Sequence, residues 1–341
     1  MAQFRVEINE SVDAQKWDAL VSQTNWGTVG QTTFWAERLV ALWNCKPYFY
    51  TVFSSTDVPV LLLVGFNITS YLSRDQPGQF IDRLKDHGKR VLRRGNRFQW
   101  FGQPVLLDHG LSGEAYKFLF SEVQRFCDGN KIHVLAPSEL PELANASIPE
   151  NWVKKKWGTY IVDLRQDVDS LWNNLKKSAR KAIRTAREDG ITVRRMRSLD
   201  ELRAYYDFVR RCSPRYGKEA YGFADWERLW RLFRPTGVFE TFLAEKSDKP
   251  LAGLSVWGYG GNISEFGSYQ SEESFREKLY GSDLIKWEVI SWGVRNGQRT
   301  FDLAGVNPEP QSPKEQGIRQ FKEKWGGRYQ EYVVVSWNRK E

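Results

Sequence analysis

A similar order of predicted short strands and amphipathic helices occurs twice along the chain. Residues 4–8 alternate polar and apolar side chains, as a half-buried strand does. Because 341 residues are enough for two cores of ordinary size, the repeated order favours two α+β domains. The first half is predicted to hold strands at 4–8, 48–54, 60–66 and 131–136 and helices at 13–22, 31–43 and 113–127. The second is predicted to hold strands at 159–164, 191–196, 238–245, 250–258, 262–269 and 299–303 and helices at 170–189, 198–211, 224–233 and 283–296.

A stretch punctuated by Pro137, Pro141 and Pro149 separates the two halves. Proline lacks a backbone N–H and breaks regular structure, so it is common in linkers. We therefore expect an N-terminal domain over residues 1–150 and a C-terminal domain over residues 151–328.

The composition excludes several classes of protein. Apolar residues make up 41% and charged residues 27% of the chain, which is typical of globular proteins and not of disordered ones. The longest apolar run, residues 58–66, is too short to span a membrane, and the N-terminus lacks the apolar segment of a signal peptide. Three scattered cysteines and three histidines indicate neither a disulfide framework nor a zinc site or histidine triad. We expect a cytoplasmic protein without a metal and without integral membrane association.

The segment from Leu171 to Glu188 carries the strongest cluster of positive charge. Net charge over the whole chain is +8, which favours an anionic partner without identifying one. At about 100° per residue, six cations of this predicted helix gather opposite an apolar stripe. Like charges on one face repel each other, so the pattern favours a surface for a diphosphate or an RNA backbone over a merely solvated face. The six cations are Lys176, Lys177, Arg180, Lys181, Arg184 and Arg187.

A strand, a proline-rich loop and a short helix near the C-terminus form the second candidate site. The strand ends at Ala304-Gly305, where a glycine allows close approach of a ligand to the backbone. Residues 317–325 repeat apolar side chains at helical spacing and place Lys322 beside the apolar face. A cation next to the end of a strand suits chemistry on a carbonyl or a phosphate. An exposed lysine on a surface helix is the alternative that spacing alone leaves open.

Five motifs of the second half carry a resemblance to a known family. They are Asp163-Leu164, the basic segment 177–191, Leu284-Ile285-Lys286-Trp287-Glu288, Phe301-Asp302-Leu303-Ala304-Gly305 and the segment 317–327 around Phe321-Lys322. In these motifs the chain resembles the FemAB/FemX family of GNAT-like acyltransferases, which includes BioF2-like acetyltransferase domains. The first half resembles this family more loosely, through residues 31–35 and the strand pair after them.

The resemblance implies a fold. It implies an α+β (α/β) protein of two tandem GNAT-like domains, each a mixed, mainly antiparallel sheet flanked by helices, with a cleft between them. It also implies that the last strand, within residues 329–341, returns to the sheet of the N-terminal domain.

The resemblance further implies a reaction and its residues. Family members use aminoacyl-tRNA to add amino acids to the stem peptide of a peptidoglycan precursor, and relatives transfer acyl groups to other amines. The family's active-site Phe-Lys corresponds to Phe321 and Lys322, and its basic helix contacts precursor phosphates. From its own position at the end of the strand, and not from the resemblance, Asp302 is a candidate base or a candidate partner that holds Lys322. The expected substrate-binding residues are Arg180, Arg184, Arg187, Lys177, Arg38, Trp35, Tyr216, Gly305 and Phe266.

The chain also departs from the family's pattern. Ala304 replaces the first glycine of the usual Asp-Leu-Gly-Gly, and Leu39, next to Arg38, stands where the first domain commonly has a lysine. The long helical arm of larger members is absent, which weakens the expectation that tRNA is the donor.

Three functions therefore stay open. The first is an aminoacyl-tRNA-dependent transferase with tRNA as partner and a phosphate-bearing acceptor. The second is an acyl-CoA-dependent N-acyltransferase, although residues 276–282 match the usual pyrophosphate loop poorly. The third is a non-catalytic tRNA- or nucleotide-binding protein. No resident cofactor is expected, because the acyl donor is a substrate.

Amide formation sets two requirements, a neutral amine and a stabilised tetrahedral oxyanion. Lys322 suits the second requirement, because an unperturbed lysine titrates near about 10.4 and is a cation at pH 7. No protein base is evident from the sequence.

Overall fold

The structure is a computed structural model that describes residues 4–24, 29–70, 96–140, 146–216, 222–237 and 239–338. It divides into two units. The first unit comprises Met1–Trp157 together with Glu331–Glu341, and the second comprises Gly158–Gln330. The cleft expected between the domains stays a prediction.

The sheet of the first unit is antiparallel except at one pair of strands. β4 and β6 run parallel, with Asn96 opposite Ile132 and Phe98 opposite Val134. The last strand, β13, pairs antiparallel with β6. Across the sheet the order is β1 (Arg5–Asn9), β2 (Asn44–Phe53), β3 (Pro59–Ser70), β4 (Asn96–Trp100), β6 (Ile132–Leu140) and β13 (Arg328–Trp337), and β5 (Val105–Leu106) pairs with β3.

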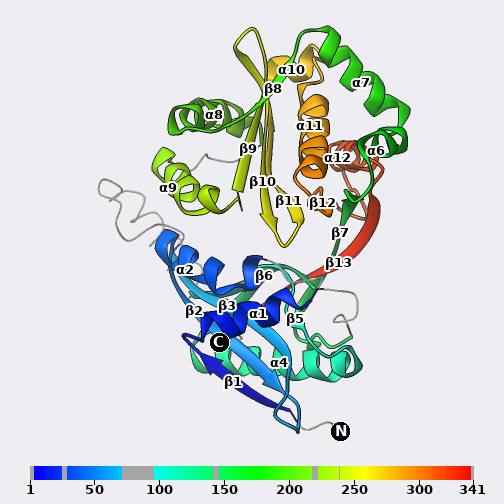
Figure 1. The fold of residues 1–341 in the computed structure, drawn as a ribbon. Helices are drawn as coiled ribbons and strands as arrows, with labels where there is room; N and C mark the ends of the chain where they lie inside the picture. Colours follow the sequence, from blue (N-terminus) through cyan, green and yellow to red (C-terminus); the bar gives the residue numbers. More distant parts are fainter. Residues whose placement is uncertain are drawn as a thin grey trace. The chain divides into compact units, whose positions relative to one another are not determined.

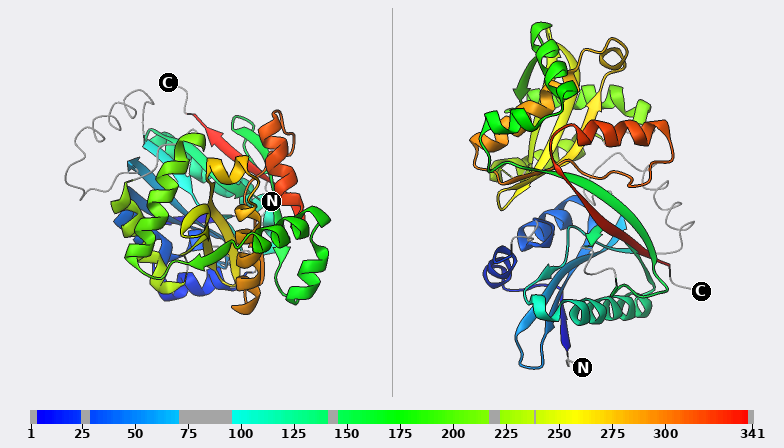
Figure 2. Two further views of the ribbon diagram at one scale, coloured as in Figure 1. Left: turned by 90° about the horizontal axis from the view of Figure 1, so that it is seen from above. Right: turned by 90° about the vertical axis from the view of Figure 1, so that its right-hand side faces the viewer.

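Helices cover both faces of this sheet (Figures 1 and 2). On β2, Phe49 contacts Trp17 of α1, while the neighbouring Tyr48 and Tyr50 contact Phe126 of α4. Because successive side chains of a strand point to opposite faces, α1 and α4 lie on opposite sides of the sheet. The helices of this unit are α1 (Ala14–Ser22), α2 (Thr33–Leu42) and α4 (Ser112–Gly129).

The second unit repeats the arrangement, with one parallel pair in an otherwise antiparallel sheet. Here β11 and β12 are parallel, and α10 and α11 lie between them along the chain. Both units thus confirm the predicted fold class of mixed, mainly antiparallel sheets flanked by helices. The strand order is β7 (Val153–Asp163), β12 (Thr300–Asp302), β11 (Asn262–Gln270), β10 (Lys249–Tyr259), β9 (Phe239–Lys246) and β8 (Thr192–Arg195).

In the second unit, α7 and α11 pack on one face of the sheet and α8 lies on the other (Figure 1). The α8 face is held by Tyr205, whose hydroxyl shares a 2.8 Å hydrogen bond with Ser255 of β10. The helices are α6 (Val168–Asn174), α7 (Lys177–Glu188), α8 (Leu199–Cys212), α9 (Phe223–Phe233), α10 (Glu272–Arg276), α11 (Gly281–Arg295) and α12 (Pro313–Glu323).

Two sequence-based predictions differ from the structure. The single helix expected from Leu171 to Glu188 is two helices, because Leu175 and Lys176 have extended ψ angles of 143° and 148° and interrupt it. The linker expected around three prolines begins later, since β6 continues through Pro137, while Pro141 lies outside the described residues. No helix within the described ranges is both long and apolar enough to cross a membrane.

Candidate active site

The candidate site of the second unit lies where its two parallel strands separate. β11 pairs with β12 only from Asn262 to Ser264, so Glu265 is the first residue of β11 beyond the pairing. Opposite this point the register with β10 shifts, because Val256 faces Glu265 whereas Ser255 faces Gly267. Phe266 is therefore the extra residue of a β-bulge. A bulge bends its strand and redirects the neighbouring side chains, which is why bulges are common beside functional sites.

Lys322 of α12 reaches the end of β12. Its Nζ donates hydrogen bonds of 3.0 Å to the carbonyl oxygens of Ala304 and of Gly305. An ammonium has three hydrogens, so one remains for another acceptor. Among the described residues no carboxylate forms an ion pair with Lys322. The side chain is half-buried, and burial is the main cause that lowers the pKa of the Lys322 ammonium.

Asp302 organises the turn that supplies these carbonyls. Its Oδ1 accepts hydrogen bonds from the Thr159 hydroxyl and, at 2.8 Å, from the backbone N–H of Ala304. Ala304 has a φ of 61°, a left-handed conformation that is unfavourable for a residue with a Cβ. Burial raises the pKa of the Asp302 carboxyl, while the two hydrogen bonds and the charge of Lys322 oppose that shift. Asp302 thus influences Lys322 in two ways. Its charge raises the pKa of the Lys322 ammonium, and its hydrogen bond to the N–H of Ala304 holds the turn whose carbonyls accept from Lys322.

A buried ion pair that was not predicted from the sequence lies beside Lys322. Lys286 of α11 donates to the Oε2 of Glu265, and the two side chains are only 2% and 10% exposed. Glu265 raises the pKa of Lys322, and Lys286 lowers it. The sequence signal was available, because Lys286 stands among Leu284, Ile285 and Trp287, all of them buried. A cation inside an apolar run requires a buried partner.

A second ion pair joins the start of α11 to the end of α12. Lys324 donates to the Oδ1 of Asp283, and its Nζ lies 4.1 Å from the centre of the Phe321 ring. Burial raises the pKa of Asp283, and the charge of Lys324 opposes this most strongly. Phe321 is half-buried against the core of this unit, with its ring 5.8 Å from that of Trp325.

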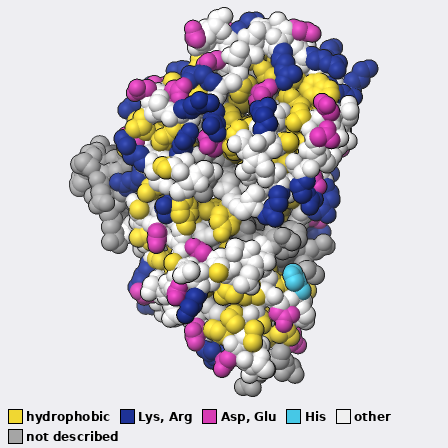
Figure 3. Space-filling view, viewed as in Figure 1, with side chains coloured by type: hydrophobic (Ala, Val, Ile, Leu, Met, Phe, Trp, Pro, Cys, Tyr) yellow, Lys and Arg dark blue, Asp and Glu magenta, His cyan; other side chains and the backbone are white. Residues whose placement is uncertain are grey.

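The cations of α7 differ in their exposure and in the contacts that they make. Arg180 donates through Nη1 to the carbonyl oxygens of Asn173 and Leu175 at 2.8 and 2.7 Å, so it holds the break between α6 and α7. Arg184 lies 5.6 Å from the centre of the Trp172 ring, and Arg187 pairs with Glu288 at 2.9 Å. Lys177 is exposed and makes no such contact with any described residue. Figure 3 shows the basic side chains that gather over α7 at the upper right. A phosphate-binding role for these residues stays a prediction.

The remaining predicted residues are placed as follows. In the first unit Trp35 is buried, and the Arg38 guanidinium lies 3.4 Å from the centre of the Phe34 ring. In the second unit the Tyr216 hydroxyl accepts a 2.9 Å hydrogen bond from the backbone N–H of Gln270, and Phe266 is 43% exposed. The described residues contain no cluster of three or more His, Cys, Asp or Glu that could hold a metal ion.

Comparisons with known proteins agree with this architecture. Residues 173–322 match the model of a family described as an acetyltransferase (GNAT) domain, and this range contains every charged residue of the site except Lys324. No curated protein sequence matches the chain.

Solved structures resemble the chain over nearly its whole length. A crystal structure of FemX superposes with a TM-score of 0.67 at 14% identity and covers 98% of this chain and 97% of its own. L-PGS from Bacillus licheniformis gives a TM-score of 0.55 at 14% identity, with coverage of 98% and 95%. A tandem GNAT protein from the clavulanic acid biosynthesis pathway gives 0.55 at 10% identity, with 98% of each chain covered. The chain therefore shares the fold of FemX and of the tandem GNAT protein, and its residues 173–322 match the GNAT acetyltransferase domain model.

Proposed function

We propose that the chain is an acyltransferase that forms an amide bond, with aminoacyl-tRNA as donor and an amine of a peptide or peptidoglycan precursor as acceptor. The observation that carries this proposal is the position of Lys322. Two backbone carbonyls just beyond the end of β12 hold its Nζ, and its third N–H has no acceptor among the residues that the structure describes. A fixed cation with one free donor suits the oxygen of a carbonyl under attack.

The reaction joins the acceptor nitrogen to the carbonyl carbon of the donor ester. The nitrogen attacks, the carbonyl oxygen becomes an oxyanion beside Lys322, and the carbon–oxygen bond to the ribose then breaks. The proton lost by the amine ends on the ribose hydroxyl that leaves. Lys322 contributes charge that is already oriented, so no solvent has to reorganise as the oxyanion forms.

The choice of tRNA as donor rests on charge. The chain has a net charge of +8, and α7 carries exposed cations, as a protein that binds an RNA backbone requires. A pyrophosphate could accept hydrogen bonds from the free backbone N–H groups in the first turn of α11. In this chain the same turn contains Asp283, which is paired with Lys324. A carboxylate at that position opposes an anionic ligand.

An acyl-CoA-dependent N-acyltransferase is the second candidate. The match of residues 173–322 to an acetyltransferase domain family favours it. The reaction at Lys322 would be the same, with a thiol in place of the ribose hydroxyl as leaving group.

One experiment tests both donors. The protein is incubated with charged tRNA or with acyl-CoA and a panel of amines, and the products are identified by mass. We expect amide product with charged tRNA and its loss after RNase treatment. RNase-resistant product from acyl-CoA would replace the first candidate by the second. Salt-sensitive tRNA binding without any product would contradict the enzymatic proposal and indicate a binding protein.

The activity should fall with rising pH at a lower pH than it would if Lys322 titrated as an ordinary lysine. Stabilisation of the oxyanion requires the protonated Lys322, and burial lowers the pKa of this group. Activity is therefore expected to decline as pH rises through a value below the usual one of about 10.4. In Lys322→Arg the guanidinium stays charged, so the decline in kcat should move to higher pH. An unchanged alkaline limb in this variant would assign the titration to another group.

A further inference from the structure

A basic pocket of about 230 Å³ lies in the second unit, apart from the Lys322 site. The two sites share no residue. Arg295 of the pocket is nine residues beyond Lys286 on α11, which corresponds to about 14 Å along the helix axis. β8, the turn after it, β9 and the C-terminal half of α11 with its cap supply the lining residues, which are Val193, Arg195, Arg197, Phe242, Glu288, Trp292, Arg295 and Asn296.

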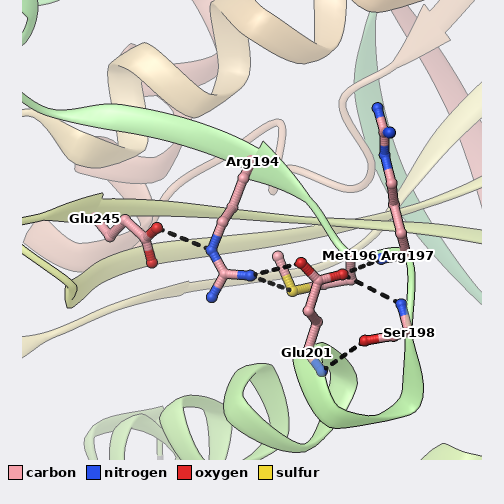
Figure 4. Close-up of polar contacts among 6 residues, drawn as sticks. All are labelled: Arg194, Met196, Arg197, Ser198, Glu201 and Glu245. Carbon is pink, nitrogen blue, oxygen red and sulfur yellow. Dashed lines mark hydrogen bonds and ion pairs between the residues drawn. The ribbon is translucent and has the colours of Figure 1, made fainter.

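The alternation of β8 decides which of its arginines face the pocket. Val193 and Arg195 line it, whereas Arg194 between them is held on the other side, at 2.8 Å from Glu245 and 3.1 Å from Glu201 of α8. Figure 4 shows this cluster, and it also shows the side chain of Arg197 pointing away from it. The backbone N–H of Arg197 donates to Glu201 at 2.6 Å, which anchors the backbone of this residue.

The charges of the pocket do not balance. Glu288 is paired with Arg187 at 2.9 Å, and Arg195 lies 3.5 Å from Glu240. The guanidinium groups of Arg197 and Arg295 make no hydrogen bond or ion pair with any residue that the structure describes. Two exposed cations therefore remain at the rim. The charge of Arg197 also acts on the Glu240 carboxylate, which Arg195 and Arg234 already accompany, and Glu288 is the one carboxylate among the lining residues.

The end of α11 lies at this pocket and acts against an anion, so the arginines have to outweigh it. A helix C-terminus carries partial negative charge on its last carbonyl groups. Here the carbonyls of Trp292, Gly293 and Val294 accept hydrogen bonds from the backbone N–H groups of Asn296, Gly297 and Gln298. Phe242 and Trp292 add an apolar floor, with their rings 5.4 Å apart at a steep angle.

We propose that this pocket binds a phosphate group of a nucleotide or of an RNA. A phosphate carries more charge than a carboxylate and accepts several N–H groups at once, which matches two unpaired guanidinium forks beside Arg195. The aromatic floor gives a base or sugar next to that phosphate an apolar surface. The inference does not rest on the proposed transferase activity, because no residue of the pocket takes part in the reaction at Lys322.

The test measures binding of phosphate compounds to the whole chain. AMP and adenosine are titrated by calorimetry, and a labelled short RNA is titrated by fluorescence anisotropy at two salt concentrations. We expect AMP to bind and adenosine to bind at least about tenfold more weakly, since only AMP offers a phosphate to the arginines. Much tighter, salt-sensitive binding of the RNA would identify nucleic acid as the source of the phosphate, and equal binding would identify a free nucleotide.

The decisive variant is the double substitution Arg197→Gln with Arg295→Gln. Both side chains are exposed, so the melting temperature should stay unchanged while AMP or RNA binds at least about tenfold more weakly. Arg210→Gln, an exposed arginine of α8 outside the pocket, is the control and should keep the affinity of the parent within about twofold. No binding to the parent, or equal affinity of parent and double variant, would overturn the proposal.

Discussion

Lys322→Ala is expected to lower kcat of the amide-forming reaction about a hundredfold to a thousandfold. Removing one preoriented donor from an oxyanion site has an effect of this size in other enzymes. The Nζ touches the end of β12 through two carbonyl oxygens and leaves one N–H for the substrate, so its loss affects the transition state more than the bound substrate. KM should therefore change far less than kcat, which steady-state kinetics with saturating donor would measure.

Two further variants make this result interpretable. Lys314→Ala removes an exposed lysine from the same helix, α12, and should leave kcat within about twofold of the parent, as is usual for surface charges. Lys322→Arg keeps the charge with a different shape and should retain more activity than Lys322→Ala. If Lys322→Ala turned over substrate at the rate of the parent, Lys322 would have no role in the chemical step.

The largest effect on stability is expected at the buried pair of Glu265 and Lys286. Glu265→Ala leaves the Lys286 ammonium buried without its carboxylate, which typically destabilises a protein by about 3–5 kcal/mol. The Lys286 side chain is 2% exposed, so water cannot take the place of the lost partner without opening the core. Urea denaturation, monitored by the protection of α11 amides against hydrogen exchange, would report the free energy of unfolding of this unit.

An exposed ion pair of the same unit provides the control. Lys249 and Glu273 are paired at 2.6 Å, but their side chains are 62% and 32% exposed. Glu273→Ala should therefore cost less than about 1 kcal/mol. The double variant Glu265→Leu with Lys286→Met should recover much of the loss, because it removes both charges together. A cost for Glu265→Ala no larger than that for Glu273→Ala would show that water reaches the pair.

Local patterns predicted the elements of the fold well, and the differences have physical causes. Ser198 and Glu201 form the capping box expected at the start of α8, since both partners lie within one turn. The predicted helix 170–189 is instead divided at Leu175–Lys176. Its periodicity continues across the break because Leu171, Leu175 and Ala179 are all buried, so the pattern by itself does not reveal the interruption. The guanidinium of Arg180 then holds the break together.

The residues of the candidate site likewise comprise some that local spacing predicted and some that it did not. Spacing along the chain sufficed to propose Lys322, Phe321 and Asp302 as one group, because they lie within about twenty residues on one strand, loop and helix. Their catalytic roles stay predictions. Glu265 and Thr159 were not predicted, and Lys286 was noted only within a motif and without a place in the site; each enters the site through packing of a separate element. Thr159 reaches Asp302 from 143 residues away, across the pairing of β7 with β12.

By itself, the sequence determined the alternation of strands and helices, the duplicated order and the position of the basic segment. These follow from side-chain periodicity and capping, which act between residues a few positions apart. The tertiary structure decided which charges are buried, which are paired and which are exposed, as Lys286, Arg187 and Arg197 illustrate. The state of a charge depends on the partners and the solvent that surround it, and distant segments of the chain supply those surroundings only after folding.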